Sequence, residues 1–288
     1  MLLKKIYLKT SCYFLTIALV SACIINDNIK DTSTFIDPGN DPNFTIIANN
    51  NTGFELFNRK VLVFEIPIYA FKEVEDNKLL HTANVLAQFL DNDEDGLIDN
   101  LGVYNNIIAN KSFLFLWKLI EERDSFTSPN GFFGNDISAD AVKPIWHTNG
   151  HVDSFDFALE NVWFLITKTG YEKNYPTVFS AQTNSEISEA MDVARGGNFI
   201  NPPATYPVGA WYTSSNVSCN YTCQISKYNY WILITKLGAQ ENRLSEIEDE
   251  WKLNTSTKLQ TIDVKAWTIF SNVSYKLPTN LPDGTYKH

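Results

Sequence analysis

The 288-residue sequence lacks the short motifs that identify several large classes of enzyme. It contains no G-x-S-x-G nucleophile elbow, no glycine loop of the kind that cradles phosphates and no G-x-G-x-x-G fingerprint for dinucleotides. The Gly196-Gly197 pair follows a predicted helix, where glycines are typical of a helix C-cap. These absences argue against a serine hydrolase, a nucleotide-hydrolysing enzyme and a dinucleotide-dependent dehydrogenase.

Positive charge is also in short supply. The chain has 23 Lys and Arg against 33 Asp and Glu, which gives a formal net charge of −10. A surface of this sign repels phosphate groups, so we expect no nucleic-acid partner. Aromatic and other apolar residues are abundant enough for one sizeable core.

Cysteine is scarce, with four residues in the chain, and two of them lie within the first 23 positions. The other two are Cys219 and Cys223. In an oxidising compartment this spacing predicts a disulfide across one turn, whose short loop would act on local geometry more than on global stability. A zinc site is the alternative, but no second pair of Cys or His stands nearby to complete it.

The N-terminus has the layout of an export signal. Three lysines within the first nine residues form a basic region, and the apolar segment that follows at 12–20 is too short for a stable membrane span. Small residues come next, as they do before a signal-peptidase cleavage point. We therefore predict a signal peptide over residues 1–22.

The cleavage region suggests a lipid anchor. Its residues, Val20-Ser21-Ala22-Cys23, resemble the lipobox of bacterial lipoproteins, in which the cysteine is acylated and becomes the first mature residue. Several acyl chains on Cys23 would anchor the chain stably, and the polar composition of residues 23–58 predicts a flexible tether. We expect a lipoprotein of the bacterial cell envelope, on the outer membrane or cell surface, that contacts the membrane through this anchor only. A plain cleaved signal, with secretion into the periplasm or medium, is the alternative.

The most informative segment is residues 91–102, where carboxylates alternate and a glycine follows. Positions one, three, five, seven and nine of an EF-hand loop bind calcium, and here they are Asp91, Asp93, Asp95, the carbonyl of Leu97, and Asp99. Gly96 stands at the sixth position, where such loops turn sharply. The twelfth position holds Gly102 instead of the usual Glu, so water, Asn100 or a distant residue must complete the shell. We predict a structural calcium site rather than a sensor; a solvated acidic turn is the alternative.

Hydrophobic periodicity places the remaining elements. We expect strands at 60–70 and 112–117, a long loop at 122–152, an extended tail at 277–284, and helices at 79–90, 103–108, 155–170, 183–196, 223–238 and 244–253. A capping box at 183–186 would open the fourth of these helices. The predicted helices at 79–90 and 103–108 thus flank the calcium loop. The prediction is one α+β domain over residues 59–288, mainly helical with a few short strands.

Several blocks of the sequence resemble a family of secreted, largely uncharacterised proteins found in bacteria and some marine animals. The matching blocks are residues 63–68, 81–88 with the calcium loop, 155–160, 190–197 and 228–231. Together they extend over most of residues 60–288. The resemblance implies a zincin-like domain with a metal site made of two helical histidines four residues apart and a glutamate from a second helix.

In this chain the three positions that match those ligands hold Phe164, Lys168 and Lys227. Phenylalanine offers no donor atom, and protonated lysines repel a dication, so we expect no zinc there. The resemblance therefore implies a degenerate metallohydrolase-like protein that acts as a binding or scaffold protein. The alternative is that these residues do not derive from a metal site. Phe164 would then pack in the core, and the two lysines would be solvated helix residues.

A second candidate metal site is the pair His147 and His151, with Asp153, Asp156 and Glu160 close behind. A loop could close these groups around a metal and give a metal-dependent hydrolase, such as a peptidase. Asn149-Gly150 favours a turn between the histidines, however, and no glutamate follows His147 as in HExxH enzymes. Ordinary surface or capping histidines are the alternative. We expect His81, on the helix before the calcium loop, to be a packed or capping residue.

Glycan binding is a third hypothesis. Four tryptophans could form a platform for sugars, and these are Trp146, Trp163, Trp211 and Trp231. Asp156 and Glu160 could in principle act as a carboxylate pair on a glycoside. The leading prediction is a calcium-binding envelope lipoprotein without catalytic activity, whose protein or glycan ligand the sequence does not identify.

Overall fold

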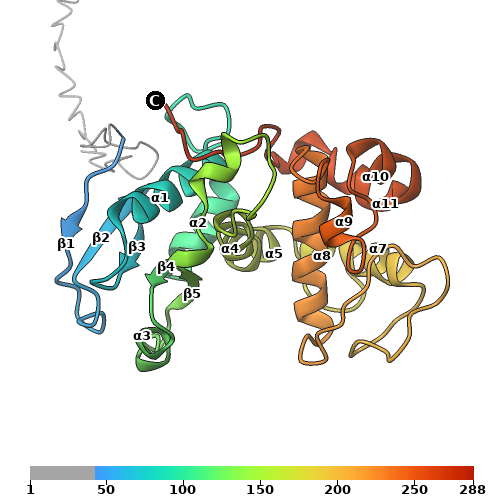
Figure 1. The fold of residues 1–288 in the computed structure, drawn as a ribbon, viewed down its shortest axis with the longest axis horizontal. Coiled ribbons are helices and arrows are strands. Elements are labelled where there is room, and N and C mark those ends of the chain that lie inside the picture. Colours follow the sequence, from blue (N-terminus) through green and yellow to red (C-terminus); the bar gives the residue numbers. More distant parts are fainter. Residues whose placement is uncertain (1–42) are drawn as a thin grey trace, which may run out of the picture. The chain divides into compact units, whose positions relative to one another are not determined.

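The computed structural model describes residues 43–288, which belong to one compact unit. The predicted signal peptide and Cys23 lie outside the described residues, as does the first part of the predicted tether. Within 43–288, no helix is both long and apolar enough to cross a membrane. The domain is α+β, with a five-stranded mixed sheet and mostly helices elsewhere, as predicted (Figure 1).

The sheet has the strand order β1-β2-β3-β4-β5. Its strands are β1 (Ile47–Ala48), β2 (Arg59–Val63), β3 (Ile66–Ala70), β4 (Ser112–Trp117) and β5 (Phe133–Ser138). The first three pair antiparallel, whereas β3, β4 and β5 pair parallel. The single strand predicted at 60–70 is therefore wrong: Phe64 and Glu65, with φ of 44° and 65°, form a tight turn between β2 and β3.

The tether prediction is wrong for residues 43–58. Phe44, Phe54 and Phe57 are buried, and the rings of Phe54 and Phe57 lie 4.5 and 5.3 Å from that of Tyr69. Aromatic side chains in an otherwise polar stretch supply the apolar area that holds this segment on the sheet. The folded domain thus includes residues that polar composition assigned to a linker.

The segment predicted as a loop at 122–152 also contains regular structure. It holds the end of α3 (Ile120–Ser125), strand β5 and two short 3₁₀ turns, Ala139–Ala141 and Pro144–His147. Gly134 in β5 makes room for a neighbouring ring, because a Cβ there would lie 2.2 Å from Cζ of Phe113. Gly134, which in the sequence is typical of a loop, thus permits close packing of β5 on β4.

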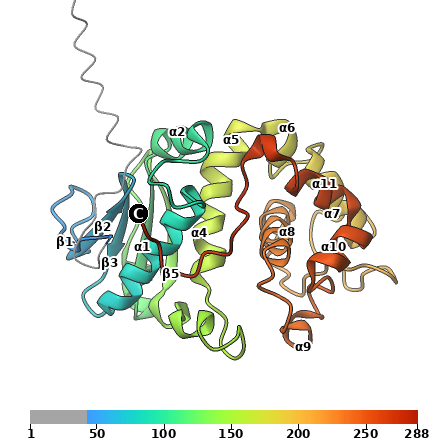
Figure 2. The same ribbon diagram turned by 90° about the horizontal axis from the view of Figure 1, so that it is seen from above.

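Two helices frame the calcium loop as predicted, namely α1 (Asp76–Leu90) and α2 (Leu101–Ala109). The helix α4 (Ala158–Ile166) lies between the sheet and α8 (Tyr221–Lys236) and contacts both (Figure 2). A π-helical turn at Thr167–Tyr171 extends α4. Such turns are frequent at functional sites.

The remaining helices are short. They are α5 (Glu172–Asn174), α6 (Pro176–Phe179), α7 (Glu186–Arg195), α9 (Leu244–Ile247), α10 (Ser256–Ile262) and α11 (Val264–Phe270), with a 3₁₀ turn at Val273–Tyr275. Ser185, rather than Thr183, caps α7 by accepting the N–H of Ser188. The helix predicted at 244–253 stops at Ile247, and the chain then places Trp251 in the core.

Candidate functional site

The predicted calcium loop begins at Asp91, which ends α1. Its Oδ1 accepts the N–H of Asp95 at 3.1 Å, and its Oδ2 accepts the N–H of Gly96 at 2.8 Å. Positive φ angles at Glu94 and Gly96, of 56° and 86°, curl the chain around these carboxylates. Ligand-capable oxygens of Asp91, Asp93 and Asp95 consequently lie within 4.8 Å of one another. The loop thus gathers three carboxylates at one place, and the binding of calcium there belongs to the proposal below.

The two later ligand positions differ in exposure. Asp99 is held beside the loop, where its Oδ2 accepts the N–H of Asn92 at 2.8 Å. The side chain of Leu97 points to solvent and is 44% exposed, as expected for a position that contributes only its carbonyl. The N–H of Leu97 donates to Oδ1 of Asp95 at 2.8 Å. These contacts leave the carbonyl of Leu97 and one oxygen of Asp99 for a cation.

Asn100 does not complete the shell, which corrects one of the predicted possibilities. Its Oδ1 accepts the N–H of Val103 at 3.1 Å and so caps α2. Its amide nitrogen donates to the carbonyl of Tyr275 at 2.8 Å. Gly102 lies inside α2, where a Cβ would lie 2.7 Å from Oδ1 of Asn174, so a glutamate in its place would require the Asn174 side chain to move. Of the predicted ways to complete the shell, water and a distant residue are left.

The C-terminal segment supports this loop, a role that the sequence analysis missed. Oδ1 of Asn92 accepts the N–H groups of Thr279 and Asn280, both at 2.8 Å. Farther along, the hydroxyl of Tyr286 donates to Oδ2 of Asp91. A hydrogen bond to a carboxylate leaves it fixed in position before an ion arrives. No periodic or motif signal in residues 277–288 points to these contacts, because they join positions almost 190 residues apart.

The electrostatics of the loop favour a cation. Burial raises the pKa of Asp91 and of Asp99, and the charges of Asp93 and Asp95 raise the pKa of Asp99 further. A carboxylate whose pKa is raised by folding stabilises the fold when protonated, and that stabilisation is lost as the pH rises through the folded-state pKa. At neutral pH these ionised groups therefore destabilise the cation-free protein.

This charge balance predicts a pH-dependent effect of calcium. Adding about 5 mM CaCl₂ should raise the melting temperature more at about pH 7 than at about pH 4.5, because protons compete for Asp91 and Asp99 at the lower pH. Differential scanning calorimetry with calcium or with a chelator measures both increments. Equal increments at the two pH values would contradict the assignment, and Asp99→Asn should reduce the difference between them.

A second candidate site is a pocket of about 540 Å³ between α4 and α8. Its walls are formed by Asn135, Glu160, Asn161, Phe164, Lys168, Asn220, Thr222, Cys223, Ser226, Lys227 and Tyr230. The three positions at which the resemblance implies metal ligands, Phe164, Lys168 and Lys227, all belong to this set. Phe164 is half-buried and faces the pocket, so the alternative of simple core packing does not describe it.

Charged groups in the pocket are paired. Nζ of Lys227 lies 3.7 Å from Oε1 of Glu160 and 4.0 Å from Oε1 of Glu250. Nζ of Lys168 lies 3.2 Å from the carboxylate of Glu172. Burial raises the pKa of Glu160, against the opposing charge of Lys227. The side chain of Glu160 is nevertheless 24% exposed, which places it at the floor of an open cavity rather than in a sealed core.

One of the two cysteines, Cys223, lines the pocket, and it is bonded to Cys219. Their Cα atoms are 5.1 Å apart and their sulfurs are at bonding distance, as predicted. Asn220 lies between them and caps α8 by accepting the N–H of Cys223 at 3.1 Å. The disulfide thus holds the first turn of the helix that carries Lys227.

The predicted pairing of His147 with His151 is wrong. His151 stacks on Trp146 with ring centroids 4.3 Å apart, and it has a positive φ of 59°. Its ring is perpendicular to that of His147, at 6.1 Å between centroids. Glu160, which was predicted to join the two histidines, lines the α4–α8 pocket. The Asn149-Gly150 turn therefore separates the two histidines, as its turn propensity suggests.

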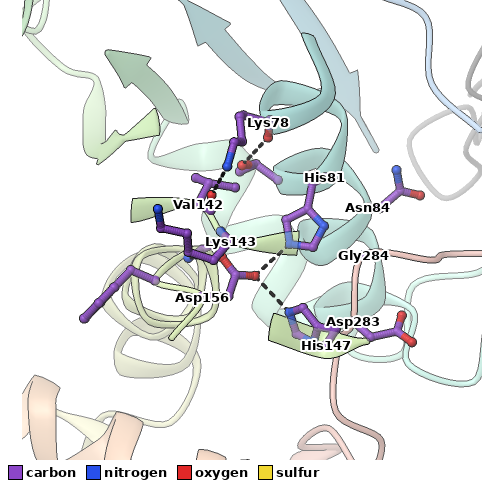
Figure 3. A network of polar contacts seen from close by, with 12 residues as sticks. Lys78, His81, Asn84, Val142, Lys143, His147, Asp156, Asp283 and Gly284 are labelled. Carbon is purple, nitrogen blue, oxygen red and sulfur yellow. Dashed lines mark hydrogen bonds and ion pairs between the residues drawn. The ribbon is translucent and has the colours of Figure 1, made fainter. Parts of the chain in front are cut away.

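His147 instead meets His81 and Asp156, as Figure 3 shows. Nε2 of His81 lies 2.7 Å from Oδ2 of Asp156, and Nε2 of His147 lies 2.9 Å from the same oxygen. The expectation that His81 only packs or caps is therefore incomplete. Sequence spacing could not reveal this cluster, because His81 and Asp156 are 75 residues apart.

The tryptophans do not form a sugar platform. Trp146, Trp163 and Trp231 are at most 8% exposed, and Trp211 is half-buried with its indole N–H on Asp263. Stacking on a sugar needs an accessible ring face, so this support for glycan binding is removed.

In comparisons with known proteins, no family model, no curated protein and no solved structure matches this chain.

Proposed function

We propose that this chain is a calcium-stabilised, non-catalytic binding protein of the cell envelope, which takes its ligand in the α4–α8 pocket. One observation carries the proposal: Phe164, Lys168 and Lys227, from two different helices, line a single cavity. Phe164 and Lys168 share one helix face, and α8 brings Lys227 to the same cavity. Their convergence supports a zincin-like site in which a phenyl ring and two ammonium groups have replaced the metal ligands.

The pocket lacks the groups that metal-dependent hydrolysis requires. None of its lining residues is a histidine, and its cysteine is tied in the disulfide. Its one lining carboxylate, Glu160, faces the ammonium group of Lys227. That ammonium group carries the positive charge that a metal ion would otherwise supply beside Glu160. The charge of this carboxylate is therefore balanced without a metal.

The volume of the pocket suits a small molecule or a short segment of a partner. Phe164 and Tyr230 offer apolar surface, whereas Asn135, Asn161 and the two lysines make the rest of the wall polar. A ligand with an apolar part and a polar or anionic end would match both kinds of wall.

The envelope location is a proposal from the N-terminal sequence, in which Cys23 carries the lipid. The disulfide supports it, because such bonds persist in oxidising compartments. Calcium reaches millimolar concentrations outside the cell, where an anchored protein would bind its ligand. Weak structural calcium sites are typical of extracellular modules.

Calcium should stabilise the full chain measurably. With a dissociation constant of about 10⁻⁴ M, calcium at about 1 mM would raise the free energy of unfolding by about 1–2 kcal/mol. Asp95→Asn should remove most of this increment, because it deletes one of three converging carboxylates. Urea unfolding with calcium or chelator measures the difference.

The matched control is Asp124→Asn. Asp124 is 61% exposed and, among residues 43–288, pairs only with its neighbour Arg123, outside the loop. It should leave the calcium increment unchanged. A wild-type protein whose stability is the same with calcium and with chelator would remove the calcium part of the proposal and leave the pocket part to be tested separately.

A further inference from the structure

Three segments that are distant in sequence bring two imidazoles and a carboxylate together beside α4. His81 comes from α1, His147 ends the 3₁₀ turn at Pro144–His147, and Asp156 precedes α4 (Figure 3). The centroids of the two imidazoles are 5.5 Å apart, and one ligand-capable atom of each residue lies within 4.8 Å of the other two. Two nitrogens and one oxygen converge on a single point.

The cluster is screened from water. The side chains of His81, His147 and Asp156 are 5%, 2% and 0% exposed. The outer oxygen of the carboxylate, Oδ1, accepts the N–H groups of Lys143 at 2.9 Å and Ala158 at 3.1 Å. These bonds fix the carboxylate so that only Oδ2 faces the imidazoles. Backbone groups that orient a ligating carboxylate in this way are a usual feature of protein metal sites.

One nitrogen of each imidazole faces the shared oxygen of Asp156. Nδ1 of His147 is buried and has no hydrogen-bond partner among residues 43–288. Nδ1 lies across the ring from Nε2, so the atom of His147 that faces Asp156 is Nε2. Both imidazoles direct Nε2 at the same oxygen of Asp156, so the three ligand-capable atoms already face one another.

We propose that His81, His147 and Asp156 bind one first-row transition-metal dication of the zinc class. Two imidazoles and one carboxylate are a common donor set for such ions, with water in the fourth position. Metal–ligand bonds of 2.0–2.2 Å place neighbouring ligand atoms about 3.3 Å apart, so the contacts at 2.7 and 2.9 Å open by about half an ångström on binding. The ion joins α1, the 3₁₀ turn and the segment that precedes α4.

This site is chemically separate from the calcium loop. Calcium is a hard cation that selects oxygen ligands, whereas imidazole suits zinc, copper, iron and nickel. It is also separate from the α4–α8 pocket, where the sequence leads us to expect no zinc. The two metals can therefore be titrated independently in the same protein.

The test uses the full chain without an affinity tag, stripped with chelator and then saturated with calcium. Cobalt(II) serves as the probe, because its visible absorption reports nitrogen coordination and zinc displaces it. We expect one cobalt per chain, and His81→Gln or His147→Gln should weaken binding about 100-fold or more. The matched controls His151→Gln and His288→Gln should bind as the wild type does.

A second measurement needs no variant. The chain has four histidines, so imidazole NMR signals can be counted directly. Adding one equivalent of zinc should shift the signals of two histidines and leave the other two in place. A wild-type chain that binds no cobalt or zinc stoichiometrically would overturn the proposal. So would zinc-dependent shifts confined to His151 and His288.

Discussion

Replacing Asp156 with alanine should lower the free energy of unfolding by about 3–5 kcal/mol, because it leaves buried polar partners without a counterpart. Those partners are the imidazoles of His81 and His147 and the N–H groups of Lys143 and Ala158. Urea denaturation in chelator measures the loss without any contribution from bound metal. The effect is large because Asp156 ties α1 and the segment 143–147 to the start of α4.

The pH dependence of this loss follows from the same contacts. Burial by itself would raise the pKa of Asp156, but hydrogen bonds from His147 and His81 hold that pKa well below its ordinary value. A depressed carboxylate pKa contributes stability above the unfolded-state pKa, and this stability is lost as the pH falls toward the folded-state pKa. The difference between wild type and Asp156→Ala should therefore be full near neutral pH and shrink below about pH 4.

The control is Asp140→Ala. Asp140 also accepts a hydrogen bond from a cationic group, Nζ of Lys118 at 2.9 Å, but it is 69% exposed. An exposed pair of this kind is worth about 0–1 kcal/mol. If Asp156→Ala cost no more than this control, the buried cluster would not hold the three segments together.

Restoring the absent ligands should create a zinc site in the α4–α8 pocket. The triple variant Phe164→His, Lys168→His and Lys227→Glu replaces a phenyl ring and two ammonium groups with two imidazoles and a carboxylate. All three side chains already face the cavity. We expect the zinc content to rise by one ion per chain, with affinity at least about 100-fold above that of the unaltered pocket. Metal analysis after dialysis and calorimetric titration measure both quantities.

The matched control places alanine at all three positions. It removes the same side chains without adding donors, so it should bind no additional zinc. The triple variant also deletes the Lys227 contacts with Glu160 and Glu250, and calorimetry checks that it still unfolds cooperatively. A folded triple variant without the extra zinc would show that the pocket does not preserve the geometry of a metal site. The interpretation as a degenerate metallohydrolase would then be wrong.

Local signals in the sequence predicted those elements whose stability is local. The helix before the calcium loop, the loop path and the Cys219–Cys223 pairing depend on residues within about a dozen positions, and each agrees with the structure. The strand β5 was missed because Gly134 and its polar neighbours read as a loop. Its pairing depends on β4, and in particular on the space that Gly134 leaves for Phe113.

The sites divide in the same way. The alternation of Asp91, Asp93 and Asp95 by itself determined a loop that gathers oxygens, because chain geometry over five residues is enough to bring them together. Only the tertiary structure decided that His81 joins Asp156, that His151 stands apart, and that the last residues of the chain support the calcium loop. Contacts between segments 75 or 195 residues apart depend on how helices pack, and packing energy is shared among many side chains that carry no pairwise signal in a single sequence.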